Sequence, residues 1–257
     1  MSSIQFETRD SVAFITLNRP DKFNSFNREM ALQMQAVLDE CKSETVRAVY
    51  ITGNGKAFSA GQDISELVGE NRIEIKQILS EHYNPIVTRI RKLDKPVVAA
   101  INGVAAGAGA NIALCCDVVV AAQSASFIQA FSKIGLIPDS GGTFFLPRLI
   151  GWQKASALSM LGDKVPAADA ERMGMLYKVF PDETFAEESK KIAATLSQMP
   201  TEGLALTKQL LNMSFHSTYE EQLLEEDVFQ QRAAMTYDYN EGINAFLEKR
   251  QPVFKGK

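Results

Sequence analysis

Apolar and polar positions in the first half of the chain follow two rhythms, one typical of strands and one typical of helices. Around a turn at Arg9 and Asp10, residues 4–8 and 12–17 alternate or cluster apolar side chains, which predicts a β-hairpin. Residues 27–42 place apolar side chains at helical spacing behind a polar start that suits an N-cap. Further strands are expected at 46–52, 96–101, 117–122 and 125–129, and further helices at 73–93 and 108–114. This alternation favours an α/β core with largely parallel pairing.

Helical patterns follow one another in the second half of the chain, from about residue 140 onward. They are expected at 143–150, 152–161, 167–173, 185–198, 202–212, 218–236 and 240–249, with one short strand at 176–180. No linker rich in proline, glycine or serine separates the two halves. We therefore predict a compact α/β domain with a helical C-terminal extension, which is typical of packing against a partner subunit.

The composition is that of a globular protein. Apolar residues make up 46% of the 257 positions and charged residues 23%. The net charge of −4 gives no general attraction for nucleic acid or for an anionic membrane, so we expect neither as a partner. The most apolar stretch, residues 96–122, is interrupted by Asn102, Asn111 and Asp117, and we interpret it as buried core rather than as a membrane span.

Cysteine and histidine usage narrows the chemistry. An odd set of three cysteines, two of them adjacent at Cys115 and Cys116, is typical of a reduced, intracellular protein. The N-terminus has no basic region followed by an apolar run, so we expect no secretory signal and a cytoplasmic location. With only His82 and His216, and no CxxC, HExxH or EF-hand pattern, we expect no metal site.

Three segments rich in small residues stand where an α/β protein binds its ligands. Residues 57–64 and 102–111 each follow a predicted strand, and residues 135–143 lead into a predicted helix. Small residues let backbone N–H groups approach a ligand closely, and two such donors on one oxygen form an oxyanion hole. The alternative is that these small residues only let helices pack tightly on strands.

Two short motifs indicate other chemistries weakly. The stretch that begins at Gly107 starts like the dinucleotide pattern GxGxxG, but Ile112 occupies the third glycine position and the next strand offers no acidic residue for a ribose. Residues 139–142, Asp-Ser-Gly-Gly, are similar to the nucleophile segment of serine proteases. A serine hydrolase that uses Ser140 would have only the two histidines as possible bases, and it is kept as an alternative.

Asp139 has two interpretations. As an N-cap of the helix that follows, it would stay charged with a lowered pKa, which makes a weak base. If the apolar residues around it, which include Phe131, Phe144 and Phe145, line a pocket with it, burial would raise its pKa toward the working pH of an enzyme. From the residues alone, capping is the favoured interpretation.

Several segments, taken in order, resemble one protein family. They are AFSAGQDI at 57–64, KPVVAAINGVAAGAGANIALCCD at 95–117, GLIPDSGGT at 135–143, EGINAFLEKRQPVF at 241–254 and RPDKFNSFN at 19–27. Together they look like the enoyl-CoA hydratase/isomerase family, the crotonase superfamily, and the likeness covers nearly the whole chain. Three segments are similar to the branch of this family that acts on a ring epoxide in phenylacetate degradation: HYNPIVTRI at 82–90, GVAAGAGAN at 103–111 and AFSKIGLIPDSGGTFFLPR at 130–148.

The resemblance implies an architecture and a substrate class. The expected fold is α/β, a crotonase-like spiral of ββα units over residues 1–190. A helical C-terminal region over residues 191–257 is expected to take part in trimerisation and to cover the CoA site. The expected assembly is a homotrimer or a dimer of trimers. The expected substrate is an acyl-CoA thioester; coenzyme A is part of that substrate, so no separate cofactor is expected.

The resemblance also assigns roles by position. The backbone N–H groups of Gln62 and Ala108 match the oxyanion hole, and Asp139 stands where isomerases of the family place their acidic residue. With the family in view, a catalytic role of Asp139 outweighs capping. The positions that match CoA-binding residues are Lys22, Asn24, Asp63, Ile64, Phe246 and Lys249. Solvated charge (Lys22 and Lys249) and helix packing (Phe246) remain the alternatives for three of them.

Two departures from the family pattern favour isomerisation over hydration. Hydratases of the family position water with two glutamates, and the matching positions here are Asn111 and Phe131, neither of which accepts a proton as a base. The expected reaction is proton transfer by Asp139 within a thioester. It converts ring-1,2-epoxyphenylacetyl-CoA to the oxepin thioester, 3-enoyl-CoA to 2-enoyl-CoA, or both. The alternatives are an enoyl-CoA hydratase with a single acid and a non-catalytic acyl-CoA-binding subunit.

Overall fold

The computed structural model describes residues 2–70 and 72–257. The chain begins with the expected hairpin, in which β1 (Ile4–Arg9) pairs antiparallel with β2 (Val12–Leu17). Asp10 and Ser11 form the turn, both with positive φ, which matches the right-handed twist of the two strands. The hairpin prediction is confirmed.

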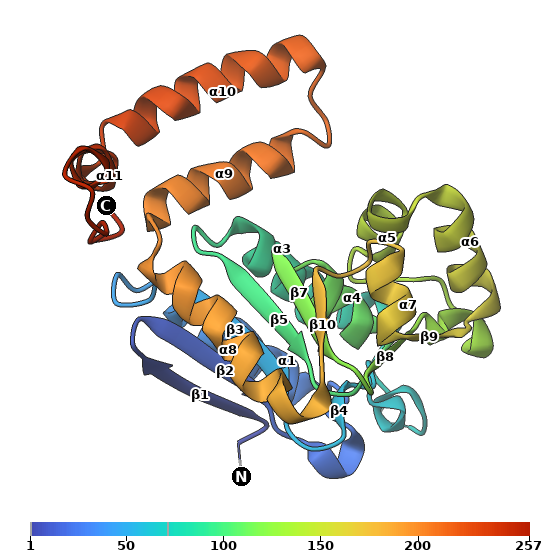
Figure 1. Ribbon diagram of the computed structural model, residues 1–257. Helices are drawn as coiled ribbons and strands as arrows, with labels where there is room; N and C mark the ends of the chain where they lie inside the picture. Colours follow the sequence, from blue (N-terminus) through green and yellow to red (C-terminus); the bar gives the residue numbers. More distant parts are fainter. Residues whose placement is uncertain (1, 71) are drawn as a thin grey trace.

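A six-stranded sheet forms the centre of the molecule (Figure 1). Its strands lie in the order β1-β2-β3-β5-β7-β10, and every neighbouring pair from β2 onward is parallel. Ile51 of β3 lies beside Ala99 of β5, which lies beside Val119 of β7, and all three are buried. The middle strands are therefore continuous apolar runs, as strands covered on both faces are. The strands after the hairpin are β3 (Ala48–Gly53), β5 (Val97–Ile101), β7 (Val118–Ala122) and β10 (Lys178–Phe180).

A second, four-stranded sheet of very short strands lies beside the first. Its order is β4-β6-β8-β9, so β3 and β4, β5 and β6, and β7 and β8 each give one strand to either sheet. This is the expected spiral of ββα units. Three of these strands were not predicted, because β4 and β6 lie in the small-residue segments interpreted as loops and β9 lies among helices. The strands are β4 (Ala57–Ser59), β6 (Val104–Ala106), β8 (Ser126–Ile128) and β9 (Lys164–Pro166).

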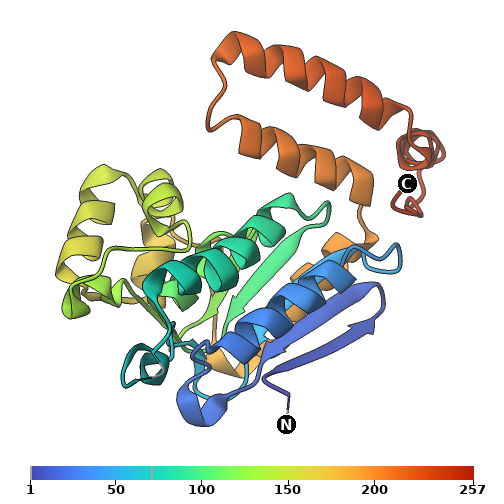
Figure 2. The same ribbon diagram turned by 180° about the vertical axis from the view of Figure 1, so that it is seen from behind.

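Helices cover both faces of the large sheet. Helices α1 (Arg28–Glu40) and α3 (Asn84–Lys92) lie over one face, and α8 (Asp182–Gln198) lies over the other (Figures 1 and 2). The side chain of Asn27 caps α1 by accepting a hydrogen bond from the N–H of Met30, as the polar start predicted.

The helix expected at 73–93 is present as one uninterrupted helical segment at 75–92, but its winding changes part-way. It consists of α2 (Ile75–Gln77), the π-helical turn η3 (Ile78–Tyr83) and α3. In the π-helical turn, the N–H of Asn84 donates to the carbonyl of Leu79, five residues back instead of four. The prediction of one long helix is confirmed, and its winding is corrected at 78–83.

The remaining elements of the body are short helices. Helix α4 (Ala108–Leu114) has the predicted bounds. The others are η1 (Pro20–Lys22), η2 (Ile64–Leu67), η4 (Ala130–Ile134), α5 (Gly142–Ile150), α6 (Trp152–Leu161) and α7 (Ala167–Arg172).

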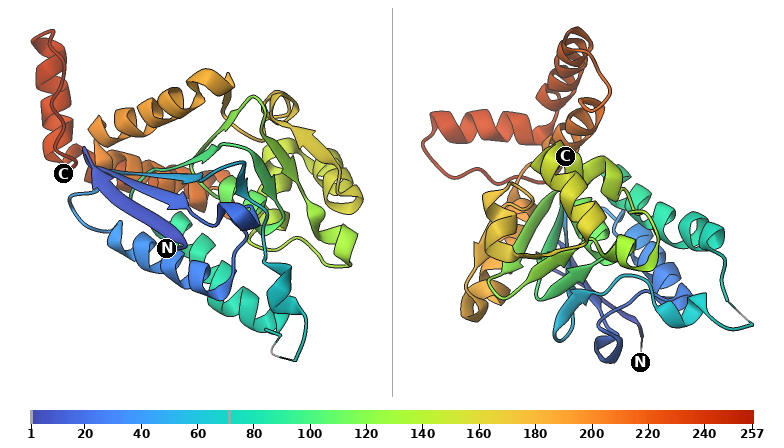
Figure 3. Two further views of the ribbon diagram at one scale, coloured as in Figure 1. Left: turned by 90° about the horizontal axis from the view of Figure 1, so that it is seen from below. Right: turned by 90° about the vertical axis from the view of Figure 1, so that its right-hand side faces the viewer.

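The C-terminal helices form an arm that extends away from the body (Figures 1 and 3). They are α9 (Thr201–Met213), α10 (Tyr219–Ala234) and α11 (Tyr237–Leu247). The expected boundary after residue 190 falls inside α8, which packs on the large sheet as one helix, so the arm begins after that helix. Among the described residues, no helix combines the length and the apolar character needed to cross a membrane.

Candidate active site

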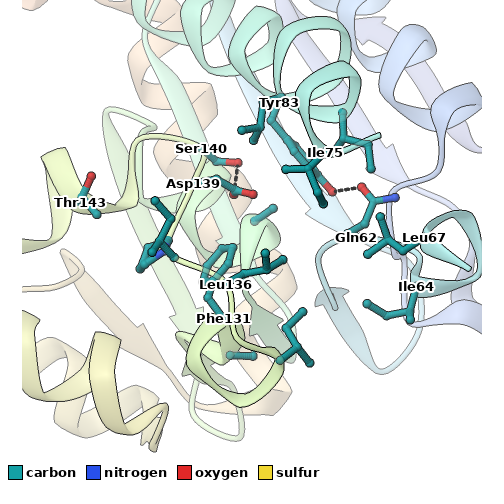
Figure 4. Close-up of a pocket in the computed structure, with 18 of the residues that line it drawn as sticks. Gln62, Ile64, Leu67, Ile75, Tyr83, Phe131, Leu136, Asp139, Ser140 and Thr143 are labelled. Carbon is teal, nitrogen blue, oxygen red and sulfur yellow. Dashed lines mark hydrogen bonds between the residues drawn. The ribbon is translucent and has the colours of Figure 1, made fainter. Parts of the chain in front are cut away.

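A cavity of about 510 Å³ lies between the π-helical turn and the segment 130–143 (Figure 4). Within the described part of the chain, Asp139 is the only carboxylate that lines it, and Lys133 is the only other charged side chain there. Most of the wall is apolar, and its larger apolar side chains are Ile64, Leu67, Ile75, Ile78, Leu79, Phe131, Ile134, Leu136 and Ile137. The arrangement is that of a small-molecule site with few polar groups.

The backbone N–H of Gln62, a residue that lines this cavity, is turned away from Phe26 by a single β-bridge. Phe26 donates its N–H to the carbonyl of Gly61 over 2.7 Å, and Asp63 donates its N–H to the carbonyl of Phe26 over 2.8 Å. In a parallel bridge of this kind, the residue between the two bonded positions turns its own N–H and C=O to the opposite side. Within the described residues, the N–H of Gln62 has no hydrogen-bond partner.

The N–H of Ala108 lies on the neighbouring segment. Ala108 is the first residue of α4, so its N–H has no partner within the helix. Gly61, directly before Gln62, packs against this segment: a Cβ built at Gly61 would lie 3.3 Å from the Ala108 nitrogen and 2.9 Å from the Ala106 carbonyl oxygen. Gln62 and Ala108 both line the cavity. The structure therefore brings the two predicted donor positions side by side.

Asp139 extends into the cavity opposite Gln62 (Figure 4). Burial raises the pKa of its carboxyl to about 6, although the Ser140 hydroxyl, which donates to Oδ1 over 2.9 Å, lowers it. The capping interpretation is wrong: α5 begins at Gly142, its N-cap is Gly141, and no side chain caps it. Because Asp139 precedes the cap by two residues, its carboxylate is free to face the cavity.

A strained turn places Asp139. Ser140 and Gly141 both have positive φ, +52° and +79°, which is uncommon for serine. The carbonyl of Asp139 accepts hydrogen bonds from the N–H of Gly142 over 2.8 Å and from Nδ2 of Asn111 over 2.9 Å. Asn111 lies behind the turn, outside the cavity lining, whereas Phe131 lines the cavity.

Tyr83 is a site residue that sequence reasoning missed. Its hydroxyl donates to Oε1 of Gln62 over 2.8 Å, at the cavity wall (Figure 4). Burial holds the pKa of Tyr83 well above its usual range, and the negative charge of Asp139 adds to this effect, so the phenol stays neutral. The π-helical turn determines where Tyr83 points, and nothing in the periodicity of this segment predicts such a turn.

Four of the predicted CoA-binding positions lie in the body. Two of these side chains are exposed, and the other two are engaged in hydrogen bonds within the protein. Ile64 lines the cavity and is half exposed, and Lys22 is exposed on the nearby turn η1. Burial alone would raise the pKa of Asp63, but hydrogen bonds from Ser65 and Arg19 lower it, which keeps this side chain charged and engaged within the protein. Asn24 is fully buried, and its amide donates to the carbonyls of Asn54 and Ala57. Their role toward CoA stays a prediction.

Phe246 and Lys249 do not meet the cavity of their own chain. Phe246 is 83% exposed on α11, at the end of the arm, and Lys249 follows that helix (Figure 1). Their predicted contact with CoA therefore needs a neighbouring subunit.

The apolar surroundings expected to raise the pKa of Asp139 are confirmed, because Phe131, Ile134, Leu136 and Ile137 line the cavity with it. Phe144 and Phe145, named with them, do not line the cavity; their rings pack on each other 5.1 Å apart and on Phe215. The serine-hydrolase alternative lacks its base, because neither histidine hydrogen-bonds Ser140 among the described residues. His216 stacks near Phe144, and the ring of His82 lies beside Arg28.

The arrangement is suited to proton transfer next to a carbonyl group. A carbonyl oxygen placed on the N–H groups of Gln62 and Ala108 would have its developing negative charge stabilised, which is worth about 3–4 kcal/mol per donor in known oxyanion holes. A carboxylate with a pKa near 6 is ionised at neutral pH and basic enough to accept a carbon-bound proton from such a substrate.

Comparison with known proteins identifies relatives along the whole chain. The family model for enoyl-CoA hydratase/isomerase matches residues 7–257. A 1,2-epoxyphenylacetyl-CoA isomerase of Escherichia coli K12 is 43% identical over 261 residues, with 100% of both chains covered. A "probable enoyl-CoA hydratase" of Rhodobacter capsulatus is 40% identical over 255 residues, with 99% of this chain and 98% of that protein covered. A trans-2-decenoyl-(acyl-carrier-protein) isomerase of Streptococcus mutans is 34% identical over 258 residues, with 99% and 98% covered.

Solved structures share the fold. An enoyl-CoA hydratase of Bacillus anthracis superposes with a TM-score of 0.94 at 32% identity, covering 99% of this chain and 100% of that one. An enoyl-CoA hydratase of Mycobacterium smegmatis superposes with a TM-score of 0.92 at 27% identity, with 99% of both chains covered. The expected α/β spiral is thus confirmed.

Proposed function

We propose that this chain, which belongs to the enoyl-CoA hydratase/isomerase family, is an isomerase of acyl-CoA thioesters. The observation that carries the proposal is the pairing of one cavity-facing carboxylate, Asp139, with two adjacent N–H groups, those of Gln62 and Ala108, that have no hydrogen-bond partner in the part of the chain that the structure describes. Chemistry with a single base needs no second carboxylate and no metal. Coenzyme A enters as part of the substrate.

For a 3-enoyl-CoA substrate, the proposed reaction moves one proton. Asp139 removes a proton from the carbon next to the thioester carbonyl, and the electron pair of that C–H bond shifts to form an enolate. The oxygen of the enolate is held by the two N–H groups. The carboxylic acid of Asp139 then returns the proton at another carbon, so that 3-enoyl-CoA becomes 2-enoyl-CoA with no net change of atoms. Asp139 ends in its ionised form, ready for another turnover.

The cavity wall supports isomerisation over hydration. Phe131 and Tyr83 occupy the wall near Asp139, and a phenylalanine ring cannot hold an attacking water by hydrogen bonding. The names of the relatives do not distinguish isomerisation from hydration, since one is named as an isomerase and another as a probable hydratase at similar identity. Among isomerisations, rearrangement of ring-1,2-epoxyphenylacetyl-CoA to the oxepin thioester is proposed first, because the relative at 43% identity is named for that substrate.

A side-by-side assay tests the proposal. The wild-type protein is given ring-1,2-epoxyphenylacetyl-CoA, a 3-enoyl-CoA and crotonyl-CoA, and the products are separated by chromatography. Isomerisation of either of the first two at a kcat/KM at least tenfold above that for hydration of crotonyl-CoA supports it. Faster hydration than isomerisation would identify a hydratase. Failure to exchange the α-proton of a bound thioester with deuterated water would identify a binding subunit.

The proposed assembly is a homotrimer or a dimer of trimers, as the family resemblance implies. The arm supports it because large apolar side chains on it are exposed, with Met235 at 85% and Phe246 at 83%. In the proposed assembly, Phe246 and Lys249 reach the CoA of a neighbouring subunit.

Light scattering tests the oligomeric state. The variants Phe246→Ala and Lys249→Ala are expected to raise KM several-fold. Lys190→Ala, on the body, is the control for loss of a surface charge.

A further inference from the structure

We propose that Asn111 is a positioning residue that fixes Asp139 relative to the N–H of Ala108. The inference rests on the proposed function, in which Asp139 is the base and Ala108 is one of the oxyanion donors. Asn111 does not line the cavity, so it acts on the reaction only through the backbone that carries Asp139.

Asn111 connects the two halves of the site. It lies three residues after Ala108 on α4, and its own N–H donates to the carbonyl of Gly107 over 3.1 Å. Its Nδ2 donates to the carbonyl of Asp139 over 2.9 Å. One short side chain therefore joins the helix turn that presents the Ala108 N–H to the turn that presents the Asp139 carboxylate.

The amide is held from both sides. Its Oδ1 accepts a hydrogen bond from Nε2 of Gln129 over 2.8 Å, and its side chain is fully buried. Only an amide of this length offers one acceptor to Gln129 and one donor to Asp139 at the same time, because a carboxylate at this position has no proton to donate. The amide thus has a fixed orientation.

The space around Asn111 allows little adjustment. A Cβ built at Gly142 would overlap the Asn111 amide, so the turn and the side chain are in direct contact. The turn itself contains two residues with positive φ, Ser140 and Gly141, which cost conformational energy unless the surroundings hold them. Of the two hydrogen bonds that the Asp139 carbonyl accepts, the one from Gly142 lies within the turn, and the one from Asn111 ties the turn to α4.

The test uses Asn111→Asp and Asn111→Ala, with Asn102 as the matched position. Asn102 is also an amide that bridges two backbone segments, since its Oδ1 accepts from the N–H of Gly53 and its Nδ2 donates to the carbonyls of Gly55 and Ala57. Asn102 does not line the cavity. Asn111→Asp keeps the acceptor and the volume and removes the donor, whereas Asn111→Ala removes both without adding charge.

Both Asn111 variants are expected to lose kcat by roughly 10- to 100-fold with KM within about twofold of wild type, since a shift of about 1 Å in a catalytic group has such an effect. Assays are run at pH 9, where the Asp139 carboxyl is ionised. Asn102→Asp and Asn102→Ala are expected to keep kcat and KM within about twofold. The inference is overturned if the Asn111 variants keep kcat, or if the Asn102 variants lose it equally.

A second measurement separates this inference from the proposed function. If the wild-type protein isomerises no thioester, the proposed function fails, and the Asn111 inference is then tested by crystal structures of Asn111→Ala and Asn102→Ala. The inference expects the turn at 139–141 to move away from α4 only in Asn111→Ala. An unmoved turn in that variant overturns it.

Discussion

The hydroxyl of Ser140 donates to Oδ1 of Asp139 over 2.9 Å, from a backbone whose φ is +52°. This neighbour opposes burial: burial raises the pKa of the Asp139 carboxyl, and the hydroxyl donor lowers it, with a result near 6. Ser140 is itself buried and lines the cavity, and its hydroxyl is engaged by the Asp139 carboxylate. The relationship assigns Ser140 to tuning the carboxylate rather than to attacking a substrate.

Ser140→Ala is therefore expected to raise the pKa of Asp139 further, because it removes a donor to the charged form. The midpoint of the rise of kcat/KM with pH would move above 6, while turnover at pH 9 stays within about tenfold of wild type. Rate measurements from pH 5 to 9 check this. Ser214→Ala, on the arm, is the control for loss of a hydroxyl. Loss of all turnover at every pH would instead support the alternative in which Ser140 acts as a nucleophile.

Asp139→Asn is expected to lose isomerisation by about 10³-fold or more, because an amide cannot accept the proton. Binding of the CoA thioester, measured by calorimetry, should stay within about threefold of wild type, since the shape of the side chain is kept. Turnover within tenfold of wild type would remove Asp139 from the mechanism.

The wild-type rate should depend on pH through Asp139. As a base, the carboxylate must be ionised, so kcat/KM is expected to rise with pH through a midpoint near 6 and to level off about one pH unit above it. A fall of kcat/KM over the same range would mean that the protonated acid is the active form. Asp139→Asn, whose residual rate should not change across this range, provides the baseline.

The raised pKa of Asp139 also affects the free energy of unfolding. Activity is expected to rise with pH, whereas the contribution of Asp139 to stability is expected to fall. Between the ordinary value of 3.8 and about 6, the folded protein binds more protons at Asp139 than the unfolded chain does, so this group costs stability as pH rises through that window. Above pH 7, Asp139→Asn should therefore be more stable than wild type, by up to about 3 kcal/mol. At pH 4 the difference should be small. Urea unfolding at both pH values measures it.

Gly61→Ala is expected to disrupt the two N–H groups. Gly61 has a φ of +86°, and an added Cβ would lie 2.9 Å from the Ala106 carbonyl oxygen, which forces the two segments apart. We expect a loss of kcat/KM of roughly 100-fold, comparable to the loss of one oxyanion donor. Gly69→Ala is the matched control, with a φ of +84° and open space around the Cβ position. Equal effects of the two variants would attribute the loss to backbone strain alone.

Much of the fold could be predicted from local patterns. Helix α4 has the expected bounds, and the hairpin differs only in that its turn lies one residue later than expected, because apolar spacing and turn residues act over a few positions. The short strands β4 and β6 could not be found in this way, since three residues give no readable alternation and their pairing depends on distant parts of the chain. The π-helical winding at 78–83 could not be predicted either, because the apolar residues of this segment suit an α-helix equally well.

The site residues likewise include some that could be assigned from the sequence and some that could not. Gln62 and Ala108 were assigned by resemblance, and their backbone geometry follows from a bridge and a helix start. Whether Asp139 caps a helix depends on where α5 begins, a matter of two residues that a sequence pattern does not fix. Tyr83 was missed because its role arises from a hydrogen bond across 21 positions of the chain.

The π-helical turn at Ile78–Tyr83 lies in the helical segment that forms one wall of the pocket. Each residue of an α-helix advances about 100° around the axis. A π-helical turn spans one residue more than an α-helical turn, so it takes up an extra residue without rotating the helix on either side. Deleting one residue here would restore ordinary winding and leave the preceding side chains facing as they do now relative to α3. A homologue shorter by one position in this segment would therefore keep the flanking wall of the pocket and differ only within the turn that carries Tyr83.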